Sequence, residues 1–394
     1  MFRYFKAVII AVLPKSESLS ATWAFPLVVL SAFMIAWGAE VAQFLVSQGL
    51  ALAMLAWLQT LPEFAVEAVI AWKAGHEPDK AHLMIANLTG SLRLLVGLGW
   101  PMIFGTATVF HRINHGRPLK EIILDDEHAV EVLALALPII YWVFIWYKAS
   151  LTVLDAGILF LLYLIYLVVL NRIPPQSEEK IEDMDIIPRT LLRSSKTIRN
   201  GGAILLFLGG GLILYFVAEP FLESMLLLAA SLGISQFLFV QWVAPFLSEF
   251  PEKLSAFNWA RRPNMAPMAL MNMVSSNINQ WTMLAAMLPV IYSISRGTVS
   301  PILFDSHQEA EILLTIAQSS LGILLLFNMR FAWYESLGIF LLWLIQFMIP
   351  ATHRLITGIY LSWCLLEVVF LLVRRKQLNA LFIFPRLLSK AGKK

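Results

Sequence analysis

Leu58-Gln59-Thr60-Leu61-Pro62-Glu63 and Leu247-Ser248-Glu249-Phe250-Pro251-Glu252 place the same Pro-Glu pair in two long apolar stretches, one in each half of the 394-residue chain. A carboxylate within a bilayer-length helix is energetically expensive, so it usually faces a polar cavity and has a function there. Two such acids at corresponding places predict one cation pathway that is built from a repeat and its copy.

The composition is that of a membrane protein. Hydrophobic residues make up 59% of the chain and charged residues only 14%, whereas a soluble protein carries roughly a quarter charged residues. The mean hydropathy is +0.74. A single cysteine, Cys364, excludes an internal disulfide. The formal charge of +3 is modest and the basic residues flank the apolar blocks, so no nucleic-acid partner is expected.

Eleven apolar segments are predicted to cross the membrane as helices, because each is close to the length that spans a bilayer. The connections on one side carry many more lysines and arginines than those on the other, which predicts an outside N-terminus and a cytoplasmic C-terminus. The predicted spans are about 24–48, 50–72, 82–110, 129–147, 152–171, 201–223, 226–258, 264–294, 310–328, 332–350 and 355–373.

The chain is predicted to be an all-α polytopic membrane protein with two inverted five-helix repeats and one extra C-terminal helix. An offset of 180 residues aligns Glu131 with Glu311 and Asp155 with Glu335. Five spans per repeat force the second copy to enter the membrane from the opposite side. The predicted divisions are a first repeat at 1–171, a polar cytoplasmic linker at 172–200, a second repeat at 201–352, and a helix with a basic cytoplasmic tail at 353–394.

The prolines are predicted to open the two acidic helices. Proline has no N–H to donate to the carbonyl four residues earlier, which frees the oxygens of Leu58 and Leu247. Pro245 similarly frees the carbonyl of Gln241. Hard cations prefer oxygen ligands, both charged and neutral. A kink with free carbonyls beside a carboxylate supplies both kinds.

A second pair of helices adds neutral oxygen atoms. Asn87 and Ser91 are four residues apart, as are Asn272 and Ser276, so each pair shares one helix face. Gly90 is expected to let another helix approach closely. The alternative interpretation is that small polar residues only hold membrane helices together.

These motifs resemble those of the sodium/calcium exchanger superfamily of cation/calcium antiporters. Its repeat carries Gly-Thr-Ser-x-Pro-Glu on one helix and Gly-Asn-x-x-Gly-Ser-Asn on the next. Besides the two Pro-Glu stretches, the corresponding segments are Ala86-Asn87-Leu88-Thr89-Gly90-Ser91-Leu92 and Met271-Asn272-Met273-Val274-Ser275-Ser276-Asn277. The resemblance covers both repeats, and therefore nearly the whole chain except the last span.

The resemblance implies a set of metal ligands. Glu63 and Glu252 would be the central calcium ligands, with calcium exchanged against sodium or protons. Asn87 and Asn272 would line the same site. The flanking ions would use Thr60, Ser91 and Ser276, and the candidate metal-binding set also includes Glu67, Glu249 and Asn277.

Four acids therefore crowd the two Pro-Glu helices. Glu249 and Glu252 are three residues apart on one face and repel each other unless a cation or a proton lies between them. Such a site binds protons as well as metal, which favours proton coupling over pure sodium coupling.

Two bases are close to these acids in the sequence. Lys253 is about 100° from Glu252 around the helix, and Arg93 is expected to point elsewhere, towards Glu40 or Glu219. If both bases are outside the pocket, up to four negative charges surround one or two cations. The alternatives for Glu40 and Glu219 are an acid paired with a base for packing, or a gate or proton relay.

The sequence thus predicts a secondary-active antiporter that exchanges calcium against sodium or protons by alternating access. Two alternatives stay open: a sodium/proton or other divalent-cation exchanger of the same fold, and a non-transporting sensor or intramembrane enzyme. The chain lacks a His-Glu-x-x-His zinc motif, and we predict that it is not an enzyme. Its predicted partners are inorganic cations and the lipid bilayer, with no cofactor and no protein partner. The predicted location is the bacterial inner (plasma) membrane.

Overall fold

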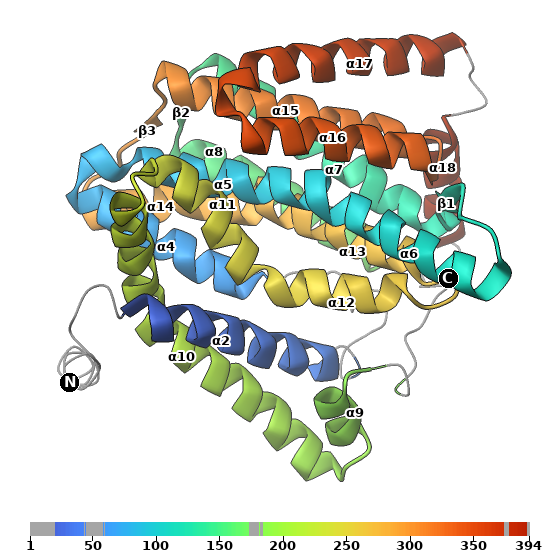
Figure 1. Ribbon diagram of the computed structural model, residues 1–394, viewed down its shortest axis with the longest axis horizontal. Coiled ribbons are helices and arrows are strands. Elements are labelled where there is room, and N and C mark those ends of the chain that lie inside the picture. Colours follow the sequence, from blue (N-terminus) through green and yellow to red (C-terminus); the bar gives the residue numbers. More distant parts are fainter. Residues whose placement is uncertain are drawn as a thin grey trace.

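The computed structural model describes residues 20–42, 44, 58, 60–172, 181, 184–373 and 378–391, and most of these are helical (Figure 1). The helices of the first half are α2 (Ser20–Ala42), α4 (Leu61–His76), α5 (His82–Leu94), α6 (Trp100–His115), α7 (Ala129–Tyr147), α8 (Val153–Leu170) and α9 (Ile186–Leu192). Those of the second half are α10 (Lys196–Ser231), α11 (Gln236–Ser248), α12 (Phe250–Ala260), α13 (Ala266–Asn279), α14 (Ala285–Arg296), α15 (Ser306–Leu326), α16 (Trp333–Met348), α17 (His353–Val373) and α18 (Asn379–Ala391).

Among the described residues, seven helical segments are long and apolar enough to cross a membrane. The chain is therefore an all-helical, polytopic membrane protein, as its composition predicts. Two shorter apolar helices, Gln236–Ser248 and Trp333–Met348, lie within two further predicted spans. The predicted division between the first two spans, at Gln48-Gly49, lies outside the described residues.

The predicted boundary between the sixth and seventh spans is wrong. The first of them was expected to end at residue 223, but α10 continues to Ser231. Residues 225–230, Met-Leu-Leu-Leu-Ala-Ala, all favour helix, so nothing stops the helix there. Gly233, with a φ of 66°, ends it, because the left-handed conformation suits glycine.

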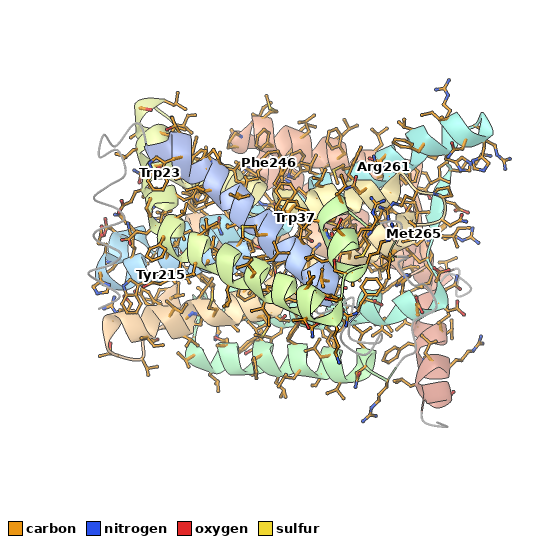
Figure 2. All side chains as sticks on the ribbon, turned by 90° about the horizontal axis from the view of Figure 1, so that it is seen from below. Trp23, Trp37, Tyr215, Phe246, Arg261 and Met265 are labelled. Atoms are coloured by element: carbon orange, nitrogen blue, oxygen red, sulfur yellow. The ribbon has the colours of Figure 1, made fainter. Side chains whose placement is uncertain are left out.

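A short helix lies within the predicted linker. Helix α9 packs against α2, and a small apolar cluster holds it there. The residues of this cluster are Val41, Met184, Leu192 and Ala203. Figure 2 shows α2, labelled at Trp23 and Trp37, beside α10, labelled at Tyr215.

The proline interrupts the acidic helix of the second half, as predicted. There α11 ends at Ser248 and α12 begins at Phe250, so Glu249 lies in the break. In the first half α4 begins at Leu61, with Pro62 in its first turn, and residues 51–57 and 59 lie outside the described part. Proline suits the first turn of a helix, where its missing N–H has no intrahelical partner to lose.

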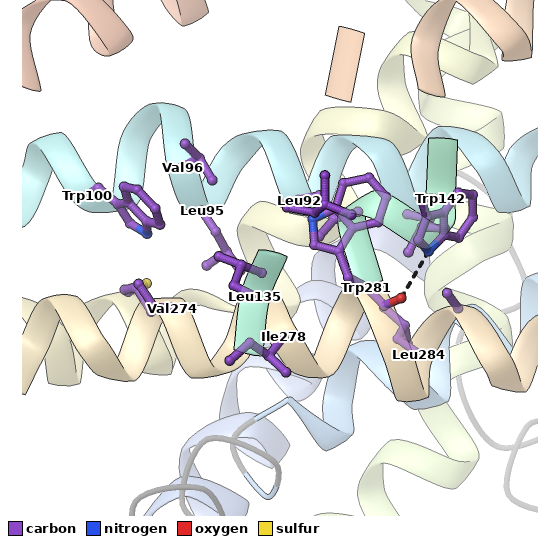
Figure 3. Packing of buried hydrophobic residues seen from close by; sticks show 14 of the residues in the cluster. Leu92, Leu95, Val96, Trp100, Leu135, Trp142, Val274, Ile278, Trp281 and Leu284 are labelled. Carbon is purple, nitrogen blue, oxygen red and sulfur yellow. Dashed lines mark hydrogen bonds between the residues drawn. The ribbon is translucent and has the colours of Figure 1, made fainter. Parts of the chain in front are cut away.

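Two π-helical turns interrupt the neighbouring helices at corresponding places. The turn η3 (Leu95–Gly99) joins α5 to α6, and η6 (Gln280–Leu284) joins α13 to α14. Figure 3 shows the apolar core around them, where the Nε1 atom of Trp142 on α7 donates a 2.9 Å hydrogen bond to the carbonyl of Trp281. Turns of this kind are frequently found at functional sites.

Short strands join the two halves at both ends of the molecule. Strand β1 (Glu121–Ile123) pairs antiparallel with β4 (Arg330–Ala332), and β2 (Ser150–Leu151) pairs antiparallel with β3 (Ile302–Leu303). Figure 1 shows β1 at one end of the helices, and β2 and β3 at the other end. Each pairing therefore links one strand from each half.

The helices of the two halves also interlock. Helix α4 packs against α14, and α5 packs against α11. At the second contact a Cβ atom on Gly90 would collide with the backbone carbonyl of Gln241. The expected role of Gly90 in close helix approach is confirmed.

Gly90→Ala is therefore expected to destabilise the folded protein by about 1–3 kcal/mol, because the backbone of α11 has to move. Gly105→Ala in α6 is the matched control, since a Cβ atom there meets nothing within 4 Å. Thermal unfolding in detergent should show a lower melting temperature for Gly90→Ala only. Equal melting temperatures for the two variants would contradict the close contact.

Candidate cation site

The two glutamates that follow the prolines lie at matching places in the fold. Glu63 is in the first turn of α4 and Glu252 is in the first turn of α12, and both side chains are buried. The partial positive charge at a helix N-terminus stabilises a carboxylate in this position. Glu63 lies close enough to Glu249, Glu67 and Glu252 to be repelled by each, most strongly by Glu249. The fold thus gathers all four predicted acids.

Glu249 organises one side of this acidic cluster. Its Oε1 atom accepts hydrogen bonds from the Ser91 hydroxyl and from Nε2 of Gln280, the latter at 2.9 Å. Its Oε2 atom accepts one from the ammonium group of Lys253. The same Gln280 nitrogen donates to Oε2 of Glu63 at 2.7 Å. One amide group therefore joins the acids of the two halves.

The other acids keep free acceptor atoms. Across the part of the chain that the structure describes, both carboxylate oxygens of Glu67 and of Glu252, and Oε1 of Glu63, accept no hydrogen bond although they are buried. Glu67 lies beside Asn87, and Glu252 lies beside Ser276. An ionised carboxylate only accepts hydrogen bonds, and leaving it buried without a partner is costly. These oxygens suit a bound cation or a proton.

The remaining predicted ligands differ in their hydrogen-bond partners. Asn272 is fully buried on α13. Thr60 accepts a 2.5 Å hydrogen bond from Nδ2 of Asn279, which connects the start of α4 to the end of α13. Asn277 donates a 3.2 Å hydrogen bond to the carbonyl of Met273 in its own helix. That contact places the Asn277 amide nitrogen against its own helix.

Sequence reasoning missed two residues that the structure places in the cluster, Asn279 and Gln280. Both are almost completely buried. Gln280 lies eight residues after Asn272 and four after Ser276, so helical spacing already placed it on the same face. Its contact with Glu63 was not predicted because the two residues are far apart in the sequence.

The two nearby bases differ from expectation. Lys253 contacts the acidic cluster, because its side chain reaches back one turn along α12 to Glu249, so the condition that both bases lie outside the pocket is not met. Arg93 does not pair with Glu40 or Glu219. Its Nη2 atom instead donates to Glu311 on α15 at 2.6 Å.

Glu311 is the centre of a separate buried network. It also accepts a 2.8 Å hydrogen bond from Gln241 and contacts Nδ1 of His353 at 2.6 Å. Glu219 lies 3.9 Å from the ammonium group of Lys73, so its ion-pair partner is Lys73 rather than Arg93. The acidic cluster therefore holds four carboxylates and one ammonium group.

The chemistry of the cluster is that of a mixed oxygen site. Among the described residues, no group of three His, Cys, Asp or Glu side chains is arranged to hold a metal ion. A metal here would combine two carboxylates with amide, hydroxyl and carbonyl oxygens.

A cavity of about 560 Å³ lies at the far end of α12 from Glu252, and its lining includes His111, Arg261 and Arg262.

Comparison with known proteins adds independent findings. The model of the sodium/calcium exchanger protein family matches residues 19–171 and 202–350. No curated protein sequence matches this chain. The crystal structure of an H+/Ca2+ exchanger CAX is 31% identical, with a TM-score of 0.87 over 98% of this chain and 95% of its own.

More distant structures share the fold alone. The sodium-calcium exchanger NCX_Mj, soaked with Na+ and Sr2+, is 19% identical with a TM-score of 0.55, over 84% of this chain and 99% of its own. Native YfkE is 16% identical with a TM-score of 0.57, over 86% of this chain and 94% of its own.

Proposed function

Because this chain belongs to the sodium/calcium exchanger protein family, whose members are transporters and not enzymes, we propose that it exchanges calcium for protons across its membrane. The observation that carries the proposal is the cluster of buried carboxylates with free acceptor atoms between the two halves. The high similarity to an H+/Ca2+ exchanger, over nearly the full length of both chains, supports protons as the counter-ion.

Calcium would bind between Glu63 and Glu252. Both side chains are buried at the starts of their helices, and Pro251 offers no N–H to the carbonyl of Leu247. Calcium takes six to eight oxygen ligands in flexible geometry. Neutral oxygens from Asn87 and Asn272 would line the same site. Thr60, Ser91 and Ser276 would serve the flanking ions, and Glu67, Glu249 and Asn277 are further candidate ligands.

The surplus of acid supports proton exchange. Four carboxylates, with Lys253 as the base that contacts one of them, leave more negative charge than one divalent ion neutralises. Carboxylates this close cannot all stay ionised without a cation between them. Protons that replace departing calcium would keep the buried cluster close to neutral. Such competition for one set of oxygens couples the two ions.

We propose that the halves are inverted repeats. Two features support this: the strand pairings β1–β4 and β2–β3 exchange when the halves are exchanged, and they lie at opposite ends of the molecule. We also propose eleven membrane spans, an outside N-terminus and a cytoplasmic C-terminus, as the sequence predicts. The proposed divisions are 1–171 and 201–352 for the repeats, 172–200 for the linker, and 353–394 for the last helix and tail.

Alternating access would then come from rocking of one helix group against the other around the fixed site. The protein is a multi-pass integral membrane protein. The bacterial inner (plasma) membrane stays a prediction.

Radioactive calcium uptake into vesicles that contain the purified protein tests this function. We expect uptake when the vesicle lumen is more acidic than the medium, because protons leave as calcium enters. A sodium-loaded lumen at equal pH should give no uptake. Uptake driven only by sodium would show that the counter-ion is wrong, and no calcium uptake under either gradient would contradict calcium exchange.

A further inference from the structure

Lys253 is an unusual component of the site. Its side chain is 6% exposed, and its ammonium group contacts Oε2 of Glu249. Burying an ammonium ion is costly unless it is paired and hydrogen-bonded. The partner carboxylate is itself held by Ser91 and Gln280, and Gln280 also contacts Glu63. The ammonium group is thus linked to the proposed calcium ligand Glu63 through the Glu249 carboxylate and the Gln280 amide.

The first half of the chain contains no counterpart of this pair. When the two Pro-Glu motifs are aligned, Thr60 corresponds to Glu249 and Phe64 corresponds to Lys253. One half therefore has a neutral pair at these positions, and the other half has an acid together with a base. The two charges cancel, so the pair adds no net charge to the second half. It adds a fixed ammonium group together with the carboxylate that binds it.

The carboxylate that holds the ammonium group has the neighbours of a small-cation site. Its other oxygen, Oε1, accepts hydrogen bonds from the Ser91 hydroxyl and from the amide of Gln280, whose own Oε1 atom is buried and accepts no hydrogen bond in the described part of the structure. Carboxylate, hydroxyl and amide oxygens are ligands that hard cations prefer. Without its lysine this group would be an anionic pocket of matching chemistry.

We propose that the Lys253 ammonium group acts as a tethered monovalent cation, which holds the position beside Glu249 that a free alkali ion would otherwise occupy. This inference rests on the proposed calcium exchange. Its consequence is that the exchanger needs no sodium, because its monovalent site is already filled. Lys253 is therefore a residue that determines ion specificity.

The test compares three proteins in vesicles with an acidic lumen. They are the unchanged protein, Lys253→Met, and the double variant Glu249→Thr/Lys253→Phe, which copies Thr60 and Phe64 of the first half. Calcium uptake is measured with sodium, methylammonium or choline as the only added monovalent cation. Each is kept well below the buffer concentration of the lumen, so that entry of neutral methylamine does not collapse the pH gradient. Choline is too large for the position of one ammonium group.

We expect the unchanged protein to be indifferent to the choice of cation. Lys253→Met should lose at least about tenfold of its uptake in choline, because a buried charge has lost its partner. Sodium or methylammonium should restore it. The double variant should respond equally to all three cations, whatever its absolute rate, because both charges are absent.

Uptake by Lys253→Met that is equal in all three cations would overturn the proposal. So would a loss that neither sodium nor methylammonium restores, or a sodium requirement that persists in the double variant. Thermal unfolding in detergent gives a second readout that needs no transport. Sodium should raise the melting temperature of Lys253→Met but not of the unchanged protein, and equal shifts would also overturn it.

The two proposals fail separately. If the unchanged protein moves no calcium, the proposed function is wrong, and the sodium-dependent melting temperature still decides the role of Lys253. If calcium uptake is normal and Lys253→Met shows no cation dependence, only the tethered-cation role is wrong.

Discussion

Glu252→Gln is expected to lower proton-driven calcium uptake by at least about a hundredfold, since the affinity of a calcium site depends strongly on the number of charged ligands. The substitution keeps the size of the side chain and removes one negative charge. Both oxygens of Glu252 are buried and accept no hydrogen bond within the described residues, so the substitution breaks none of the described hydrogen bonds. Glu63→Gln should have a similar effect.

Glu223→Gln is the matched control for this prediction. Glu223 is an exposed acid on α10 that pairs with Lys73 at 2.5 Å. An exposed ion pair contributes little to stability, so its uptake should stay close to that of the unchanged protein. Proteoliposome uptake at saturating and limiting calcium would separate lost affinity from lost turnover. Near-normal uptake by Glu252→Gln at limiting calcium would contradict its role as a ligand.

Arg93→Met is expected to destabilise the fold by about 3–5 kcal/mol, because it leaves the buried Glu311 carboxylate without its main positive partner. Arg93 is fully buried, and its guanidinium group lies 5.0 Å from the ring centre of Trp242. The pair links α5 to α15, and His353 extends the network to α17. Loss of the arginine should therefore loosen several helices at once.

Two further variants test the origin of that effect. Arg93→Met/Glu311→Gln removes both charges, and replacement of a whole buried pair is often nearly neutral, so most of the stability should return. Arg330→Met removes the exposed partner of Glu121, a 3.0 Å pair, and should change the melting temperature little. Thermal unfolding in detergent measures all three. A melting temperature for Arg93→Met equal to that of the unchanged protein would show that Glu311 does not depend on it.

In most places the local sequence predicted where a helix ends or is interrupted. The break at Pro251 was predicted because proline acts on its own helix through the missing N–H. Helix α7 begins and ends where its apolar run does, at Ala129 and Tyr147. The end of α10 was wrong, because the apolar run continues past residue 223 and only the backbone of Gly233 stops it.

The sequence predicted where the site lies better than it predicted which residues form it. Glu63, Glu249 and Ser91 were named from the motifs, and the structure gathers them around Gln280. Gln280 itself was missed because its partner Glu63 is 217 residues away in the chain. Amide side chains pair with many groups, so their sequence position does not specify a partner.

By itself the sequence determined that this is a polytopic membrane protein with one acid-bearing, proline-interrupted helix in each half. Apolar run length, proline chemistry and charge composition act locally, so they can be read along the chain. Only the tertiary structure decided that Gln280 joins Glu63 to Glu249 and that Arg93 pairs with Glu311. Both outcomes depend on which buried groups the packing of separate helices brings together, because a buried charge takes the partner that the fold places within reach.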